Sequence, residues 1–257
     1  MQMSFYTGKV GASAQQTKMD VTANNIANIG TAGYKAKSLC FSDLVYNNMA
    51  GRDGAESDVK CGSGAKPDKT NTSFEKGSVN PGSQLDFSIE GRGFFGLQNP
   101  QTKEKYYTTS GNFVLAEKGD SFYLASKEGY FVLNRDGNPI KIRSTNGPVT
   151  DEAIELGKDG SPLEGEAVAL EDAQPAVFDF FRTDGMLSVG DSNFIPVEKN
   201  GAPFLSDANV TRGSFEGSNV DISKEFTKVI EAQRAYQYSL RMVQTTDEIQ
   251  NLINNLR

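Results

Sequence analysis

The sequence predicts an α+β fold in which long helices at the two ends of the chain flank an inserted, mainly β body. Residues 4–28 carry a heptad-like stripe, residues 71–215 contain short β-type runs separated by turns, and residues 219–256 carry a second helical stripe. Neither stripe is hydrophobic enough to fold by itself, so we expect the two helices to pair antiparallel. The predicted domains are 1–70 with 216–257, which hold the helices and a Gly-rich loop, and 71–215, the β body.

The N-terminal helix is predicted from mostly small residues at heptad spacing, which favour a closely approaching partner helix. These residues are Phe5, Ala12, Met19 and Ile26, with Gln16 and Ala23 at the positions between them. Gly30 and Gly33 follow, and glycine readily takes the left-handed conformation that ends a helix. Residues 39–49 are expected to form a short helix or an extended arm. The polar, Gly-rich residues 50–70 are expected to form a surface loop or to be disordered in the monomer.

The middle of the chain is predicted to be an all-β meander or barrel, because aromatic and β-branched runs alternate with turns. The expected strands lie at 84–89, 106–109, 112–116, 121–124, 130–133, 177–181, 186–189 and 193–197. Residues 144–175 are acidic and loop-like. The string GRGFFG at 91–96 matches a dinucleotide fingerprint, but no helix is predicted after it. We therefore expect a tight β connection there, with Phe94 or Phe95 in the core.

The C-terminal helix is predicted over residues 219–256, with Asn219 or Asp221 as its N-cap. Its stripe follows a 3-4 spacing through Phe226, Val229, Gln233, Tyr236, Leu240 and Val243, then shifts by one position to Thr246, Ile249, Ile253 and Leu256. Such a stripe favours coiled-coil packing over a simple globular face.

The composition argues against several classes of function. The 257 residues carry a net charge of −7 and no basic run longer than two residues, so neither nucleic acid nor an anionic membrane surface is an expected partner. The absence of histidine removes the commonest general base and the commonest metal ligand, so any catalysis would need carboxylates, lysines or serines, and a metal site is not expected. Cys40 and Cys61 are too few for a zinc site, and we expect two free thiols, with a bridge between them as the alternative.

The N-terminal residues lack the basic and apolar regions of a cleavable secretory signal. No window approaches the roughly 18 apolar residues that a membrane span requires. We therefore expect neither Sec-type export nor membrane insertion.

Several strings of the sequence are specific enough to indicate a family. Near the N-terminus stands NNIANIGTAGYK at 24–35, followed by Phe41 and Asp43, and near the C-terminus stand EGSNVD at 216–221 and EAQRAY at 231–236. In the middle stand QLDFSIEGRGFF at 84–95, YT at 107–108 and GNF at 111–113. Together these strings resemble the motifs of bacterial flagellar basal-body rod and hook proteins, a family of axial proteins.

The resemblance implies a structural subunit with no enzymatic activity and no cofactor. It implies a helical tube of subunits in the rod of the basal body, with the paired terminal helices as its inner wall and the β domain outside. Such a tube transmits torque to the hook and carries the export channel. The implied partners are further copies of the chain, other rod subunits, hook protein and ring proteins. The flagellum's own type III export apparatus would export the chain without cleaving a signal peptide.

The resemblance favours one member type over others. The chain length and the string at 231–236 are most like the distal type of rod subunit. The opening residues 3–8 are somewhat more like hook protein, so that a proximal rod or short hook-type subunit is the alternative. A β binding module or carbohydrate-active enzyme, with the helices as stalks, is the rival from another class. It requires a cleft lined by aromatic residues and paired carboxylates.

The motifs and stripes together give the candidate assembly residues. In the N-terminal motif these are Asn24, Asn25, Asn28, Gly33, Tyr34 and Lys35. In the C-terminal segment they are Asn219, Asp221, Phe226, Gln233, Arg234, Tyr236, Leu240 and Val243. The asparagine amides can satisfy carbonyls at a helix end by ordinary C-capping, or cross to the backbone of a neighbour. Of the helix residues, Phe226, Tyr236 and Leu240 are expected in the core of the helix pair, and Gln233 and Arg234 in hydrogen bonds between subunits.

Overall fold

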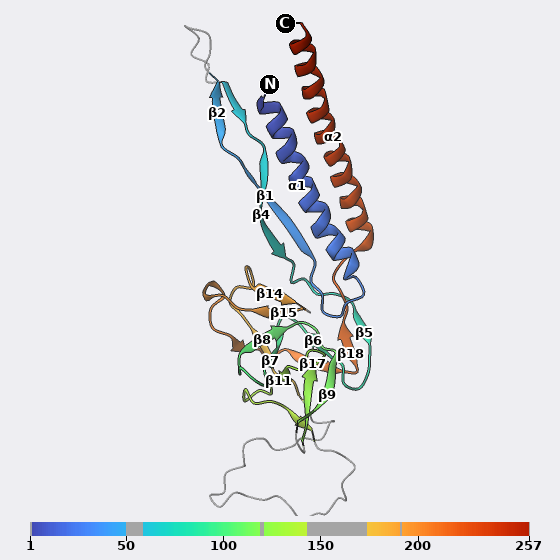
Figure 1. Ribbon diagram of the computed structural model, residues 1–257. Coiled ribbons are helices and arrows are strands. Elements are labelled where there is room, and N and C mark those ends of the chain that lie inside the picture. Colours follow the sequence, from blue (N-terminus) through green and yellow to red (C-terminus); the bar gives the residue numbers. More distant parts are fainter. Residues whose placement is uncertain (1, 50–58, 119–120, 143–173, 191, 257) are drawn as a thin grey trace, which may run out of the picture. The chain divides into compact units, whose positions relative to one another are not determined.

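A computed structural model describes residues 2–49, 59–118, 121–142, 174–190 and 192–256 (Figure 1). The fold is α+β, as predicted, with a helix at each end of the chain and strands between them. The strand pairs among these residues are antiparallel. The chain divides into two compact units, which are residues 1–29, 36–73 and 220–257 (the helical unit) and residues 30–35 and 74–219 (the β body).

The two helices of the helical unit begin and end close to their predicted bounds. Helix α1 spans Gln2–Ala27 and α2 spans Ile222–Asn255. Asp221 is the N-cap of α2, because its carboxylate accepts hydrogen bonds from the backbone N–H groups of Ser223 at 3.0 Å and Lys224 at 3.3 Å. The acidic cap satisfies donors that the first helical turn leaves unpaired.

The helices α1 and α2 lie side by side and contact each other through small and polar residues (Figure 1). A Cβ added to Gly8 would lie 2.9 Å from Val243 Cγ2, so a larger residue at position 8 would force the helices apart. Ser4 Oγ lies 3.5 Å from Thr246 Oγ1. Glycine and serine at these positions let the two backbones approach closely.

The stripe of α2 that is shielded from solvent differs from the predicted one. The buried and half-buried residues at 3-4 spacing, here called the seam, are Glu225, Val229, Ala232, Tyr236, Ser239, Val243 and Thr246. The prediction that Phe226 and Leu240 lie in the core of the helix pair is therefore wrong, since both are exposed. The predicted one-position shift after Val243 is also absent, because the seam continues in step to Thr246. Where the two stripes differ, the seam has Glu225, Ala232 and Ser239 in place of Phe226, Gln233 and Leu240.

Two antiparallel ribbons complete the helical unit. Strand β1 (Lys37–Asp43) pairs with β4 (Ala65–Thr72), and β2 (Tyr46–Met49) pairs with β3 (Val59–Gly62). Residues 39–49 are thus an extended arm, and strands β3 and β4 replace the predicted loop over part of 50–70, of which 50–58 lie outside the described residues. The alternation of large and polar residues in this arm is too weak to predict strands, and its pairing is with residues far along the chain.

Helix α1 contacts both β1 and β4. Gly64, between β3 and β4, lies against the side chains of Thr7 and Val10. Cys40 is a free thiol, and its Sγ accepts a hydrogen bond from Asn71 Nδ2 at 3.2 Å. The prediction of a free thiol is confirmed for this cysteine.

The β body is built around one large sheet. The described strands of the whole β body are β5 (Val79–Pro81), β6 (Phe87–Glu90), β7 (Phe94–Gln98), β8 (Lys105–Thr108), β9 (Phe113–Lys118), β10 (Ser121–Ser126), β11 (Phe131–Val132), β12 (Lys141–Ile142), β13 (Val177–Asp179), β14 (Leu187–Gly190), β15 (Asn193–Ile195), β16 (Phe204–Leu205), β17 (Asn209–Arg212) and β18 (Ser214–Glu216). A short 3₁₀ turn lies at Glu198–Asn200. The main path runs β12-β10-β11-β7-β8-β15-β14, with β9 beside β10, and with β13 beside β7 and β16. Separate ribbons pair β17 with β6 and β18 with β5. The acidic segment predicted at 144–175 lies almost wholly outside the described residues.

Strand β7 explains the glycine-rich string at 91–96. It lies between β8 and β11 in the sheet, and a strand rather than a helix follows the glycines, which excludes the dinucleotide reading. Only one of Phe94 and Phe95 was expected in the core, but both are buried, and they point to opposite faces of the strand. Phe95 belongs to one apolar cluster of the β body and Phe94 to a second.

Candidate assembly site

Asn25, near the end of α1, joins three segments of the helical unit. Its Nδ2 donates to the backbone oxygen of Lys37 at 2.8 Å and to Glu225 Oε2 at 3.0 Å, and its Oδ1 accepts from Lys37 N at 2.9 Å. Both Asn25 and Glu225 are buried. Lys228 Nζ lies 2.5 Å from Glu225 Oε1 and supplies the opposite charge. The amide therefore ties α1 to the start of β1 and to the first turn of α2 within one chain.

The other two asparagines of the N-terminal motif lie nearer to solvent. Asn28 Nδ2 donates to the backbone oxygen of Asn24 at 2.9 Å, which satisfies a carbonyl of the last helical turn. Asn24 is exposed. The capping role considered from the sequence fits Asn28, whereas Asn25 has the longer-range role.

Gly33, Tyr34 and Lys35 are buried in the β body. Gly33 has φ +66°, and an added Cβ would lie 2.4 Å from Ser110 N, so that both conformation and space demand glycine. Its N–H donates to Glu216 O at 2.7 Å. Lys35 Nζ forms a buried ion pair with Glu216 Oε1 at 2.7 Å. This pair joins the TAGYK string to the EGSNVD string.

Asn219 and Asp221 have different surroundings. Asn219 Nδ2 donates to Glu75 O at 3.0 Å, which places this residue in the β body. Asp221 is the exposed N-cap of α2, where the backbone N–H of Lys224 and then that of Ser223 hold the pKa of the carboxyl below its usual value. Of the two residues predicted as caps, Asp221 caps the helix.

A second stripe of α2, here called the outer stripe, is exposed along its whole length. Its members are Ile222, Phe226, Ile230, Gln233, Gln237 and Leu240. Phe226 is 52% exposed and Ile230 50%, although both are large apolar residues. An apolar stripe on a helix that already packs on one partner is suited to receive another helix.

The predicted C-terminal residues thus divide into groups. Tyr236 and Val243 lie in the seam, Phe226, Gln233 and Leu240 lie on the outer stripe, and Arg234 is exposed on another face. Sequence reasoning missed the seam residues Glu225, Ala232 and Ser239. Their exact seven-residue repeat with Thr246 was available as a signal, but none of the four is strongly apolar.

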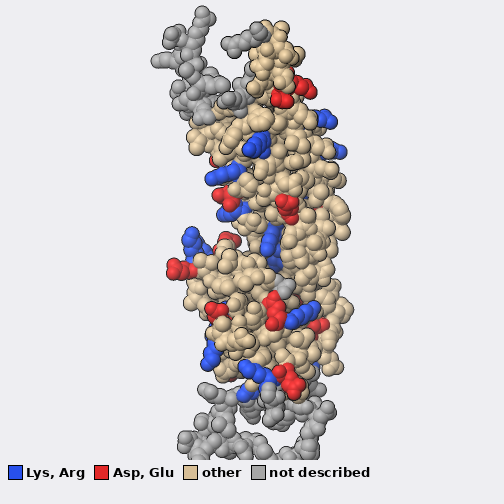
Figure 2. All heavy atoms as spheres, viewed as in Figure 1, with Lys and Arg blue, Asp and Glu red and all other residues tan. Residues whose placement is uncertain are grey.

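Other kinds of site would require a surface of one charge sign, a cluster of metal-ligating side chains or a membrane-spanning helix. On the face shown in Figure 2, acidic and basic side chains are interspersed, and no surface of one sign extends across it. Within the described ranges, no group of three or more Cys, Asp or Glu side chains could hold a metal ion. Neither helix in that part of the chain is long and apolar enough to span a bilayer.

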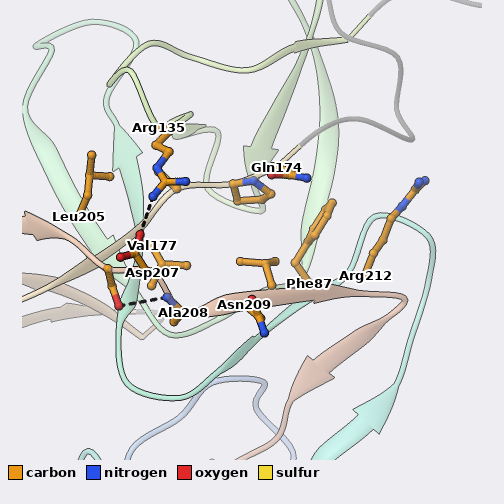
Figure 3. Close-up of a pocket in the computed structure, with 13 residues that line it drawn as sticks. Phe87, Arg135, Gln174, Val177, Leu205, Asp207, Ala208, Asn209 and Arg212 are labelled. Atoms are coloured by element: carbon orange, nitrogen blue, oxygen red, sulfur yellow. Dashed lines mark hydrogen bonds and ion pairs between the residues drawn. The ribbon is translucent and has the colours of Figure 1, made fainter.

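A pocket of about 420 Å³ in the β body offers a test of the carbohydrate-enzyme rival (Figure 3). Asp207 is the one carboxylate among its described lining residues, and it pairs with Arg135 at 2.6 Å. Phe87 is the one aromatic residue there. A glycosidase needs two carboxylates across the scissile bond, so this pocket does not support that chemistry.

Comparison with known protein families matches three segments of the chain. Residues 5–35 match a family model described as flagella basal body rod protein. Residues 88–161 match the D1 domain of flagellar hook protein FlgE/F/G, and residues 211–256 match the C-terminal domain of flagellar basal body rod FlgEFG protein. The first of these segments contains the string at 24–35, and the last contains the strings at 216–221 and 231–236.

Individual relatives match the chain from end to end. The flagellar basal-body rod protein FlgG of Bacillus subtilis (strain 168) is 32% identical over 273 aligned positions, which cover 99% of both chains. FlgG of Caulobacter vibrioides is 28% identical over 98% of both chains, and the rod protein FlgF of Mesorhizobium japonicum is 28% identical over 96% of this chain and 94% of its own. Since the Bacillus relative aligns along the whole length and the family models match both helical ends and the β body, the chain belongs to the FlgG family of flagellar basal-body rod proteins.

Proposed function

We propose that this chain is a structural subunit of the distal flagellar rod, which polymerises into a helical tube that transmits torque to the hook and encloses the export channel. The proposal is supported by the relatives, which are named as proteins of the basal-body rod, and by surfaces of this chain that are suited to assembly. The polymer is built by the helical unit, and the β body carries its own core. No catalytic step and no cofactor belong to this function.

We further propose that α1 and α2 form an antiparallel pair that acts as the assembly element. The proposal is supported by contacts between the start of α1 and the end of α2, such as Ser4 with Thr246, and between the end of α1 and the start of α2, such as Asn25 with Glu225. Because the seam already occupies one stripe of α2, copies of the chain meet through other faces of the pair. The same pairing sets the proposed domain division, with the helical ends as polymerisation domain and the β body folding by itself.

The outer stripe of α2 is the observation that carries the proposal. A helix whose apolar residues served only its own fold would bury Phe226 and Ile230 in the seam, yet about half of each side chain is exposed. Burying a large apolar side chain against a neighbour stabilises the complex by about 1.5–3 kcal/mol. Repeated along the helix and along the polymer, this stripe supplies a continuous driving force for assembly.

The test places a charge on the outer stripe. Phe226→Asp and Leu240→Asp put a carboxylate where a neighbouring copy has to pack, so neither variant should form rods by electron microscopy, and cells should be non-motile and lack hooks. Both variants should retain the helicity and the melting temperature of the wild-type monomer, because these side chains contribute little to the seam. Thr227→Asp is the matched control, since it adds the same charge to an exposed position outside the stripe and should polymerise normally.

Rods assembled by the two stripe variants at the wild-type level would refute the assignment of this stripe to assembly. Hydrogen exchange gives an independent measure. Residues of α2 on the outer stripe should gain protection on passing from the dilute monomer to the polymer, as expected for helices whose stability depends on packing. Equal protection in both states would also contradict the proposal.

Assembly with other rod subunits, hook protein and ring proteins, and export by the flagellar type III apparatus without cleavage, belong to the same proposal. They are supported by family membership. The mass of the subunit extracted from isolated basal bodies should equal that of the primary translation product. A mass lower by a segment of signal-peptide length would contradict uncleaved export.

A further inference from the structure

We infer that a set of buried bonds in the β body, here called the junction clamp, positions the segments through which the chain passes between the two units, and that Lys35 and Glu216 are its central positioning residues. The junction clamp comprises residues 33–35, 75–78 and 216–219. The inference rests on the proposed function, because it assigns to this cluster the stiffness that a torque-transmitting subunit requires.

The path of the chain makes the location of these residues significant. The chain changes units after residues 29, 35, 73 and 219. Each of the three clamp segments lies next to one of these changes on the side of the β body. A bond among the three segments therefore restrains several connections at once.

The bonds within the clamp converge on Glu216. Its Oε1 accepts from Lys35 Nζ at 2.7 Å and from the backbone N–H of Gly77 at 2.7 Å. The backbone oxygen of Glu216 accepts from Gly33 N at 2.7 Å. One residue of the C-terminal segment thus holds both of the other segments.

Further bonds close the clamp around this ion pair. Lys35 Nζ and Asn219 Nδ2 both donate to the backbone oxygen of Glu75, each at 3.0 Å. Gly217 N donates to Ser78 O at 2.7 Å. The side chains of Lys35 and Glu216 are only 4% and 9% exposed. Charge-assisted hydrogen bonds between such buried groups are strong. Loss of either partner leaves an uncompensated buried charge, so we expect the bonds of the clamp to break together rather than one at a time.

The clamp is not needed to fill the core of the β body. The two apolar clusters of that body contain none of the clamp residues. We therefore expect that its loss lowers the stability of the β body but leaves the sheet folded, and that the connections between the units become free to move. Free connections act as hinges, and a polymer of hinged subunits bends more easily.

The test measures the clamp in the monomer and stiffness in the polymer. In Glu216→Gln, amide exchange at Gly33, Gly77 and Gly217 should accelerate together by about tenfold or more, because the segments open as one cooperative unit. Polymers of this variant should show a persistence length in electron micrographs reduced by about twofold or more, as hinges in each subunit predict. Glu198→Gln, which neutralises an exposed carboxylate of the same body, is the matched control and should leave both quantities unchanged.

Two further variants keep the inference testable if Glu216→Gln folds poorly. Lys35→Arg keeps the positive charge, so its amide exchange should stay slow and its polymers should be as stiff as the wild type. The double variant Lys35→Gln with Glu216→Gln removes both charges without leaving one unpaired, and its polymers should still be flexible. Polymers of the double variant as stiff as the wild type, or exchange that accelerates at only one of the three segments, would overturn the inference. Failure of the wild type itself to polymerise would instead count against the proposed function.

Discussion

Two phenylalanines, one in each unit of this chain, have opposite surroundings. In the β body, Phe95 is 1% exposed and packs edge-to-face on Phe113, with ring centroids 5.3 Å apart. In the helical unit, Phe226 on α2 is 52% exposed, although the neighbouring seam is buried or half-buried. The β body also has exposed phenylalanines, such as Phe181 at 86%, but its core consists of large apolar side chains. The helical unit leaves the large apolar side chains of the outer stripe exposed, and we propose that neighbouring copies cover them.

The largest expected effect comes from truncating each phenylalanine in turn. Phe95→Ala should destabilise the β body by about 3–5 kcal/mol, because it removes a buried aromatic ring and leaves a cavity. Phe226→Ala should change monomer stability by no more than about 0.5 kcal/mol, as for other surface positions, while weakening polymerisation. Calorimetric unfolding of the two monomers checks the contrast. Similar losses of stability in both would mean that Phe226 contributes to the fold of the monomer rather than to contacts with neighbouring copies.

The independence of the β body can be tested with two fragments. A fragment of residues 30–219 contains the whole body, whereas one of residues 74–219 lacks Lys35 and leaves Glu216 buried without a cation. The shorter fragment should be less stable by about 3–5 kcal/mol in urea unfolding, the usual cost of breaking a buried pair. Lys35→Met in the longer fragment should reproduce the loss. Equal stability of all three proteins would show that the ion pair does not matter to the body.

The seam can be tested by adding bulk to it. Ala232 is 1% exposed, so Ala232→Leu should force α1 and α2 apart and destabilise the helical unit by about 1–3 kcal/mol, the usual cost of overpacking. The melting of the β body should not change, because Ala232 belongs to the helical unit and shares no partner with the core of the β body. Gln233→Leu adds a similar side chain at the next residue but on the exposed stripe, and should be tolerated. If Gln233→Leu destabilised the helical unit and Ala232→Leu did not, the stripe predicted from the sequence, which contains Gln233, would be the one that packs on α1.

The smallest expected effect is the pH dependence of the α2 N-cap. The pKa of Asp221 is lowered in the folded chain, so its contribution is present above the unfolded pKa of about 3.9 and is lost as the pH falls through the folded pKa. Far-UV circular dichroism should therefore show a small loss of helicity in this acidic range. Asp221→Asn keeps a cap acceptor but cannot titrate, so its helicity should lack this step. The same acid transition in both proteins would assign it to another group.

The sequence by itself determined the two helices, most strands of the β body and the family. These features depend on residues close together in the chain, such as turns between aromatic runs, a helical period uninterrupted by proline, and the strings at 24–35 and 216–221. The burial of Phe94 and Phe95 was also predictable, because two adjacent aromatic residues in a strand can each enter a core on opposite faces.

Only the tertiary structure decided which stripe of α2 meets α1 and which charged residues pair. Hydrophobicity selects Phe226 and Leu240, whereas the seam holds Glu225 and Ser239, each one residue earlier. Ser239 is small and lets two backbones approach closely, and Glu225 accepts a hydrogen bond from Asn25. Lys35 and Glu216 are 181 positions apart, and nothing local marks either as the partner of the other. Their pairing follows from burial, since a lysine and a glutamate removed from water at the same place are stable only together.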